Sequence, residues 1–202
     1  IVSNYHDLTP PFCFSQLAIR DQARRTRPAF SEDWVRDRIL AQGALDGLPS
    51  DERLLLLGMI NTGYRISEGA NLMPSEIILE AAVPHLRFDG EFRRLKTHAA
   101  YRVIPLTGIS LEAFRAAPQG FSRLRGDEAL SSRLNRFLTG SGLRESDRHT
   151  THSFRHSLSS RLAIRGVHEN LIAEILGHSL RRGYGRGTPL QMLLQILKPA
   201  AF

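Results

Sequence analysis

Apolar residues recur at helical spacing along most of the chain. The segment after Ser31 has acidic residues in its first turn and apolar side chains beyond it, which predicts a capped helix. Residues 51–61 are largely apolar after an acidic start, which predicts a buried helix, and Gly63 separates it from another helix expected to begin near Ser67. Thr150 is expected to cap a later helix. The further predicted helices cover 110–117, 127–139, 152–165, 168–176 and 190–197.

Between these helices the pattern changes to short segments rich in β-branched and aromatic residues. Strands are predicted over 76–81, 85–89 and 101–106. A turn signal at Asp89-Gly90 favours an antiparallel arrangement, with Lys96 between the second and third strands. The chain is therefore expected to be a mainly α-helical α+β protein with a small three-stranded antiparallel sheet.

The length of 202 residues suits one domain with a hydrophobic core and a short arm before it. Residues 1–29 contain the helix-breaking pair Pro10-Pro11 and a basic cluster, so we interpret them as a linker from a missing N-terminal DNA-binding domain. The folded domain is placed at 30–202. The cluster is expected to lie along DNA, and a solvated tail is the alternative. Its members are Arg20, Arg24, Arg25 and Arg27.

Several classes of protein are excluded by what the sequence lacks. No run of about 18 apolar residues predicts a membrane span, and the first residues do not form a signal peptide. The single cysteine, Cys13, excludes an internal disulfide and a zinc site built from cysteines. These features favour a cytoplasmic, nucleoid-associated bacterial protein.

The charge balance favours a polyanionic partner. The formal net charge is +7, with 27 basic residues against 20 acidic ones. Arginine supplies nearly all of the positive charge, because lysine occurs only at Lys96 and Lys198. The guanidinium fork matches phosphate oxygens well, so we expect double-stranded DNA as partner. A basic surface that binds nothing is the alternative.

Two short motifs place basic and titratable side chains on predicted helices. Arg65 precedes Glu68 by three residues, a spacing at which a helix would bring the carboxylate to the guanidinium. His152 and Arg155 have the same spacing and would share a helical face, which suits an anion with a titrating oxygen. A structural ion pair is the alternative for the first motif, and a basic helix surface for the second.

The C-terminal third holds two more candidates. His178 follows a predicted helix end at Gly177, where capping of the helix is the alternative role. Tyr184 stands between glycines, where a core tyrosine would be unusual. A metal site built from His149, His152 and His156 is disfavoured, because no carboxylate or cysteine set accompanies them. No metal or other cofactor is expected.

Taken together, these groups suit metal-free phosphodiester cleavage. Such a reaction needs a nucleophile, cations for the charge on the non-bridging oxygens, and an acid for the leaving oxygen. Tyr184 could supply the nucleophile and Lys96 the acid. Arg65, Arg155 and His178 could supply the stabilising groups.

Four motifs in order carry a resemblance to a known family. TGYRISEGANL, LKT, HSFRH and LGHS resemble the catalytic motifs of the tyrosine recombinases (phage integrase family), and the similarity runs from about Phe30 to the end of the chain. The resemblance implies the catalytic-domain fold of that family. It also implies site-specific cleavage and rejoining of DNA through a 3′-phosphotyrosyl intermediate, for integration or excision of a mobile element.

The resemblance also implies a role for each residue. Arg65 and Arg155 would bind the scissile phosphate, Glu68 would orient Arg65, and Lys96 would protonate the 5′-oxygen. His152 would assist proton transfer, His178 would hydrogen-bond the phosphate, and Tyr184 would attack. The apolar helix over 190–197 would pack on a neighbouring protomer in a synaptic tetramer, with docking on its own core as the alternative.

One feature departs from the family pattern. The interval from His178 to Tyr184 is shorter than the usual one, so an impaired, DNA-binding remnant is one alternative. DNA relaxation like that of a type IB topoisomerase is another, since it shares this chemistry. A basic structural protein is the third.

Overall fold

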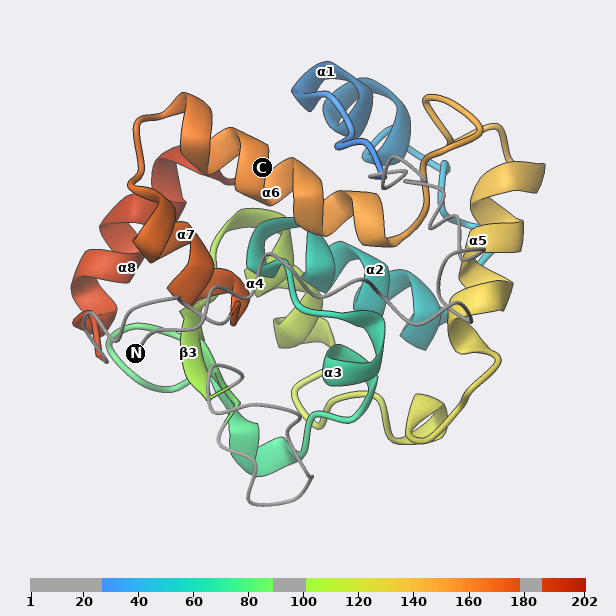
Figure 1. The fold of residues 1–202 in the computed structure, drawn as a ribbon. Coiled ribbons are helices and arrows are strands. Elements are labelled where there is room, and N and C mark those ends of the chain that lie inside the picture. The colour runs from blue at the N-terminus through green and yellow to red at the C-terminus, as the bar shows by residue number, and fades with distance from the viewer. Residues whose placement is uncertain (1–26, 89–100, 179–186) are drawn as a thin grey trace, which may run out of the picture.

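The computed structural model describes residues 27–88, 101–178 and 187–202, and within these it is a mainly helical α+β fold (Figure 1). The helices before the sheet are α1 (Glu32–Trp34), which continues as the π-helical η3 (Val35–Ile39), α2 (Ser50–Thr62), α3 (Ile66–Ala70) and the 3₁₀-helical η4 (Pro74–Glu76). Those after it are α4 (Gly108–Ala116), η6 (Ser122–Leu124), α5 (Leu130–Gly140), α6 (His152–Ile164), α7 (Glu169–Leu176), α8 (Leu190–Leu197) and η7 (Lys198–Ala200). The mainly α-helical prediction is thus confirmed.

Most helix boundaries follow the sequence signals. The Ser31 side chain accepts a hydrogen bond from the Trp34 N–H and caps α1, as predicted, whereas the π-helical continuation was not. The predicted cap at Thr150 is wrong, because the N-cap of α6 is Thr151 and its side chain makes no capping bond. Ser153 Oγ instead accepts from the Thr150 N–H at 3.1 Å. The α5 helix starts at Leu130, three residues later than predicted.

The three predicted strands form one antiparallel sheet in the order β1-β2-β3. The strands are β1 (Ile77–Ile78), β2 (His85–Phe88) and β3 (Arg102–Pro105), and Phe88 pairs with Arg102. The predicted sheet is confirmed, but β1 is much shorter than expected. Glu76 belongs to η4, where its carboxylate accepts from the Met73 N–H, so the chain is still turning at the predicted start of the strand.

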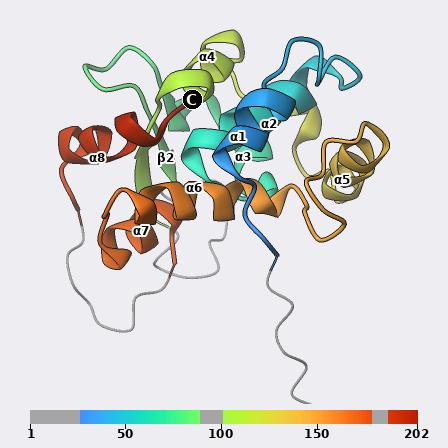
Figure 2. The ribbon, with the colours of Figure 1, turned by 90° about the horizontal axis from the view of Figure 1, so that it is seen from above.

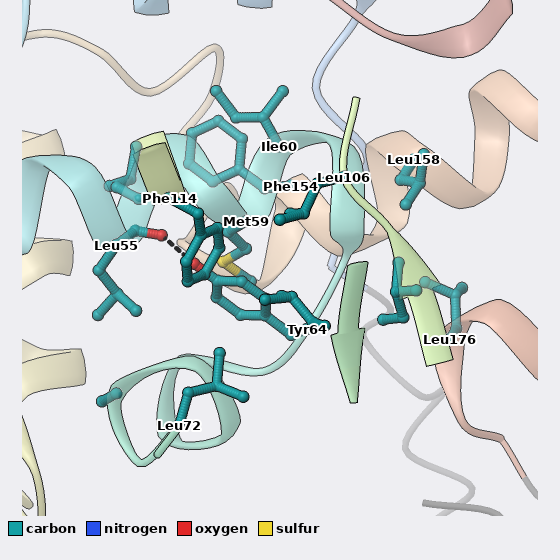
Figure 3. Close-up of a cluster of buried hydrophobic side chains, with 14 of the residues drawn as sticks. Leu55, Met59, Ile60, Tyr64, Leu72, Leu106, Phe114, Phe154, Leu158 and Leu176 are labelled. Carbon is teal, nitrogen blue, oxygen red and sulfur yellow. Dashed lines mark hydrogen bonds between the residues drawn. The ribbon is translucent and has the colours of Figure 1, made fainter. Parts of the chain in front are cut away.

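The core surrounds α2, which packs against both α4 and α6. Figure 3 shows Tyr64 in this core, below α2 and next to Phe114. The Tyr64 hydroxyl donates to the Leu55 carbonyl at 2.6 Å, so a fully buried phenol is satisfied within the core. In both Figure 1 and Figure 2, α5 lies at one end of the molecule and α7 and α8 at the other, with α6 spanning between them.

The α8 helix packs on its own chain against β3, with Leu193 and Leu197 buried. The residues after it reach the start of α4 and the end of α2, where the Ile109 N–H donates to the Phe202 carbonyl at 2.7 Å and Asn61 Nδ2 donates to it at 3.1 Å. This is the arrangement in which α8 docks on its own core, and packing on a neighbouring protomer stays a prediction. No helix in the described ranges is both long enough and apolar enough to cross a membrane.

Candidate active site

The first basic motif emerges from the core where α2 ends. Gly63 closes α2 in the left-handed region, with φ +62°, which a glycine adopts at little cost. An added Cβ there would lie 2.6 Å from Leu176, so the position also requires a residue without a side chain. Tyr64 then inserts into the core, and Arg65 emerges as the N-cap of α3 with its side chain 42% exposed.

Arg65 and Glu68 form the predicted pair, although not as neighbours on one helix. Arg65 has an extended backbone at the N-cap, and Glu68 reaches back from the third helical position. The Arg65 N–H donates to Glu68 Oε2 at 2.8 Å and Arg65 Nη1 donates to Oε1 at 2.7 Å. Both the backbone and the side chain of Arg65 are therefore held by one carboxylate.

The second basic motif begins α6. Arg155 is only 1% exposed, and its guanidinium donates to the carbonyls of Gly63, at 2.5 Å, and Leu176. Both carbonyls lie at helix C-termini, where the peptide dipoles leave partial negative charge that favours a cation. Arg155 thus joins the end of α2 to the end of α7, directly before His178.

His152 and His178, the two histidines predicted to belong to the site, have lowered pKa values and are neutral near pH 7. Burial, followed by the positive charge nearby, lowers the pKa of His152 from 6.5 to about 4. Partial burial together with Arg155, Arg65 and Arg102 lowers the pKa of His178 to about 4. An anion placed among these groups would reverse the repulsion and favour protonated imidazole.

Four of the six predicted catalytic residues, Arg65, His152, Arg155 and His178, therefore lie close enough for the charges of the two arginines to affect both histidines. Burial lowers the Arg155 pKa to about 9, and repulsion from Arg65 and then Arg102 contributes. The charge of Arg65 also lowers the pKa of His152 and of His178.

A cleft of about 460 Å³ opens beside Arg65 and His152. Its lining includes Arg27, Arg65, Ser67, Asn135, Thr151 and His152.

The sequence reading missed Arg102, which is buried beneath this cluster. It occupies β3, and its Nη2 donates to Glu68 Oε2 at 2.8 Å. The alternation of the strand could have revealed it, because Arg102 and Ile104 lie on the same face of β3 and both are buried.

The remaining predicted residues lie outside the described ranges. Lys96 belongs to the connection between β2 and β3, and Tyr184 to the connection between α7 and α8. Arg20, Arg24 and Arg25 precede the first described residue, whereas Arg27 lines the cleft. Their catalytic and DNA-binding roles stay predictions.

The three histidines considered as metal ligands make ring contacts in the structure. His149 stacks on Phe30, with ring centroids 4.5 Å apart, while the rings of His152 and His156 lie edge to face at 5.0 Å. Among the described residues, no three His, Cys, Asp or Glu side chains gather as metal ligands would.

The helical arrangement, the three-stranded sheet and the Arg65–Glu68 and His152–Arg155 motifs define a tyrosine recombinase catalytic-domain fold. The chain belongs to the phage integrase family, whose sequence model matches residues 36–182. This confirms the resemblance seen in the sequence. Tyr184 lies just beyond the matched range. A search of curated protein sequences finds no match.

Two solved structures of similar fold are a transposon integrase and a site-specific recombinase. The Tn1549 transposon integrase in complex with transposon right end DNA has a TM-score of 0.58 at 18% identity, over 97% of this chain and 67% of that one. The XerH site-specific recombinase bound to a palindromic difH substrate has a TM-score of 0.56 at 17% identity, over 84% of this chain and 49% of that one. The chain thus spans from about half to two thirds of their length, and at these identities the likeness is one of fold.

Proposed function

We propose that this chain is the catalytic domain of a site-specific DNA recombinase that cleaves and rejoins strands through a 3′-phosphotyrosyl intermediate. The observation that carries the proposal is the exposed guanidinium of Arg65, fixed by a largely buried carboxylate, beside imidazoles that are neutral near pH 7. Such a site offers a fixed cation and proton acceptors to one phosphate. The complexes of the Tn1549 integrase and XerH with DNA support DNA as the partner.

Each described residue has a role in this proposal. Arg65 binds a non-bridging oxygen of the scissile phosphate from the cleft. Arg155 adds positive charge from the buried side of the site. Its guanidinium also carries more N–H donors than its bonds to the Gly63 and Leu176 carbonyls use. His152 accepts or returns a proton. His178 hydrogen-bonds the phosphate, whose negative charge is also stabilised by Arg65 and Arg155.

Two roles come from the family resemblance. Lys96, on the connection between β2 and β3, protonates the departing 5′-oxygen, and Tyr184 attacks the phosphorus. The bond to Tyr184 conserves the energy of the phosphodiester, so a second 5′-hydroxyl can rejoin the strand without an added energy source. Strand exchange serves integration or excision of a mobile element.

The assembly belongs to the same proposal. Residues 1–29 link this domain to an N-terminal DNA-binding domain, and 30–202 form the catalytic unit. Four protomers associate on DNA through α8, whose Met192 is 47% exposed while Leu193 and Leu197 hold the helix to its own chain. Exchange of α8 between protomers would require the release of this docked helix.

A nicked suicide substrate tests the chemistry, because loss of the short fragment traps the covalent adduct. The wild-type chain is expected to form a protein–DNA adduct that resists denaturing electrophoresis. Tyr184→Phe abolishes the adduct and leaves DNA binding intact, while Tyr101→Phe, a tyrosine 51% exposed, keeps it. An adduct of undiminished yield in Tyr184→Phe would remove this residue as the nucleophile.

The chief alternative is a DNA-binding remnant without cleavage. The short interval from His178 to Tyr184, and a family match that ends before Tyr184, favour it. In that case the wild-type chain binds DNA with strong salt dependence but forms no adduct. Relaxation of supercoiled DNA without a specific site would indicate topoisomerase-like activity instead.

A further inference from the structure

A buried arginine lies behind the proposed phosphate site. The Arg102 side chain is 2% exposed, and its guanidinium carbon lies 4.4 Å from the centroid of the Phe88 ring, across the β2–β3 pair. An ion this deeply buried loses its hydration, so the fold must supply opposite charge and hydrogen-bond acceptors around it.

Arg102 obtains these acceptors from two segments of the site. Its Nη2 donates to Glu68 Oε2 at 2.8 Å, on α3, and its Nε donates to the Ile175 carbonyl at 3.1 Å, at the end of α7. The neighbouring carbonyl, that of Leu176, accepts from Arg155. The last turn of α7, from which the chain continues into His178, is therefore held by two buried guanidiniums.

Glu68 links the buried Arg102 to the partly exposed Arg65. Its two carboxylate oxygens accept from Arg102 on the buried side and from Arg65 on the cleft side. Burial alone would raise the Glu68 pKa, but the charge and hydrogen bond of Arg102, followed by those of Arg65, lower it to about 2. Glu68 is therefore ionised throughout the physiological range, and Arg102 is the largest favourable contribution to that state.

We propose that Arg102 is a positioning residue: it fixes the Glu68 carboxylate, which aims Arg65 into the cleft, and it ties this pair to the end of α7 through the Ile175 carbonyl. The inference rests on the proposed function, since it assigns Arg65 to a DNA phosphate. Arg102 touches no reacting atom. It acts by preventing Glu68 from rotating away from Arg65, so that the guanidinium is held before DNA arrives.

A double-mutant cycle separates positioning from general stability. Arg102→Lys keeps the charge but loses the planar fork that joins Glu68 to Ile175. Arg161→Lys is the matched control, because Arg161 is also a buried arginine, 1% exposed over the whole residue against 7% for Arg102, but bonds to Ile60, Asn61 and Ala200. Both variants are made in the wild-type chain and in Arg65→Ala. Affinity for a labelled DNA duplex is measured by fluorescence anisotropy at fixed salt.

Arg102→Lys is expected to weaken DNA binding about tenfold, equivalent to about 1.4 kcal/mol, in the wild-type background. The same change has no further effect in Arg65→Ala, because the side chain it positions is gone. Arg161→Lys leaves affinity unchanged in both backgrounds, even where it lowers stability as much. An equal effect of Arg102→Lys in both backgrounds would overturn the proposal.

Hydrogen exchange gives a second readout that needs no DNA. The Arg65 N–H donates to Glu68 Oε2, so its exchange reports whether the carboxylate stays in place. We expect Arg102→Lys to accelerate exchange at this amide beyond any global change, and Arg161→Lys not to. If the wild-type chain binds no DNA, the proposed function fails, and this measurement alone decides the role of Arg102. Unchanged exchange at Arg65 contradicts it.

A milder variant covers the case in which Arg102→Lys does not fold. Phe88→Leu keeps Arg102 but removes the aromatic ring under its guanidinium. A smaller loss of affinity is expected, again absent in Arg65→Ala. A loss that persists in Arg65→Ala would assign Arg102 and Phe88 to the core alone.

Discussion

Two buried arginines on one helix, Arg155 and Arg161 of α6, have nearly the same local chemistry. Each is 1% exposed and donates to backbone carbonyls near the end of α2. Arg155 also reaches the end of α7, whereas Arg161 holds the C-terminal segment through Ala200 and lies 4.5 Å from the Phe202 ring centroid. Helix C-terminal carbonyls can thus accommodate a buried guanidinium without a carboxylate in direct contact.

The two arginines differ in the charges around them. Burial lowers the pKa of both, to about 9 for Arg155 and about 10 for Arg161. Among the neighbouring charges, Arg65 and Arg102 oppose the charged form of Arg155 and outweigh Glu68, which favours it. For Arg161, Glu32 favours the charged form and outweighs Arg165, which opposes it. A concentration of like charge costs stability when no anion is bound, so it is consistent with the phosphate site proposed above. Burial and hydrogen bonds alone would not distinguish Arg155, the arginine proposed to act on DNA, from Arg161.

The largest expected effects come from replacing each arginine by methionine. Arg161→Met should lower the free energy of unfolding by about 3 kcal/mol, because buried carbonyls lose their donor. Arg155→Met should lower it by only about 1 kcal/mol, because relief of repulsion offsets part of the loss. DNA affinity should change in the opposite order, with a loss of about tenfold or more for Arg155→Met and none for Arg161→Met.

Urea unfolding followed by the fluorescence of Trp34, the single tryptophan, measures the stabilities, and anisotropy measures the affinities. Equal losses of affinity in the two variants would remove the distinction between the two arginines. So would a loss of stability in Arg155→Met as large as that in Arg161→Met.

Sequence reasoning succeeded where a periodic pattern decides the structure. Most helices and the antiparallel sheet follow from spacing, apart from the cap at Thr150 and the length of β1, and Arg65 and Arg155 stand in compact motifs. The burial of Arg161 was missed because arginine is read as a surface residue. Its spacing did contain the signal, since Phe154, Leu158, Arg161 and Leu162 recur on one buried face of α6.

What the sequence could not supply is the partner of each buried charge. Glu68 was assigned to Arg65 from a spacing of three, but its second partner, Arg102, is 34 residues away. Such a contact depends on where β3 lies relative to α3, which no local pattern encodes. The position of Arg27 is of the same kind, because a residue of the predicted linker lines the same cleft as Arg65 and His152 only in the folded chain.

A second test sharpens the comparison from the backbone side. Gly63, whose carbonyl holds Arg155, has φ +62°, and an added Cβ would lie 2.6 Å from Leu176 and 3.0 Å from Leu158. Gly63→Ala is therefore expected to lower the free energy of unfolding by about 2–3 kcal/mol, through backbone strain together with crowding. It should also weaken DNA binding, because the acceptor of Arg155 shifts.

Gly142→Ala is the matched control, since Gly142 has φ +63° but nothing within 4 Å of an added Cβ. We expect only the backbone cost of about 1 kcal/mol and unchanged affinity. Urea unfolding and anisotropy again give both quantities. Identical behaviour of the two alanine variants would mean that the packing around Gly63 does not support Arg155.

The smallest effect is the pH dependence of the cationic cluster. In the folded chain the pKa of His152 and of His178 is about 4, below the ordinary 6.5, so the unfolded chain binds more protons between these values. The contribution of these two histidines to the free energy of unfolding is therefore complete above pH 6.5, and it is lost as the pH is lowered toward 4. The carboxylate Glu68, with its pKa lowered from 4.5 to about 2, contributes its own loss only below about pH 4.5.

Binding of DNA should show the opposite slope in the same window. Phosphate oxygens favour protonated imidazole, so affinity at constant salt should rise as the pH falls from 7 to 5, while stability declines. Replacement of His152 and His178 by glutamine should reduce the slope of both curves between pH 4.5 and 6.5. His156, whose pKa is also lowered by burial, still contributes to the slope that remains in the stability curve. Stability and affinity that rise or fall together would show that these histidines do not face the bound anion, and the charge around Arg155 would then need another explanation.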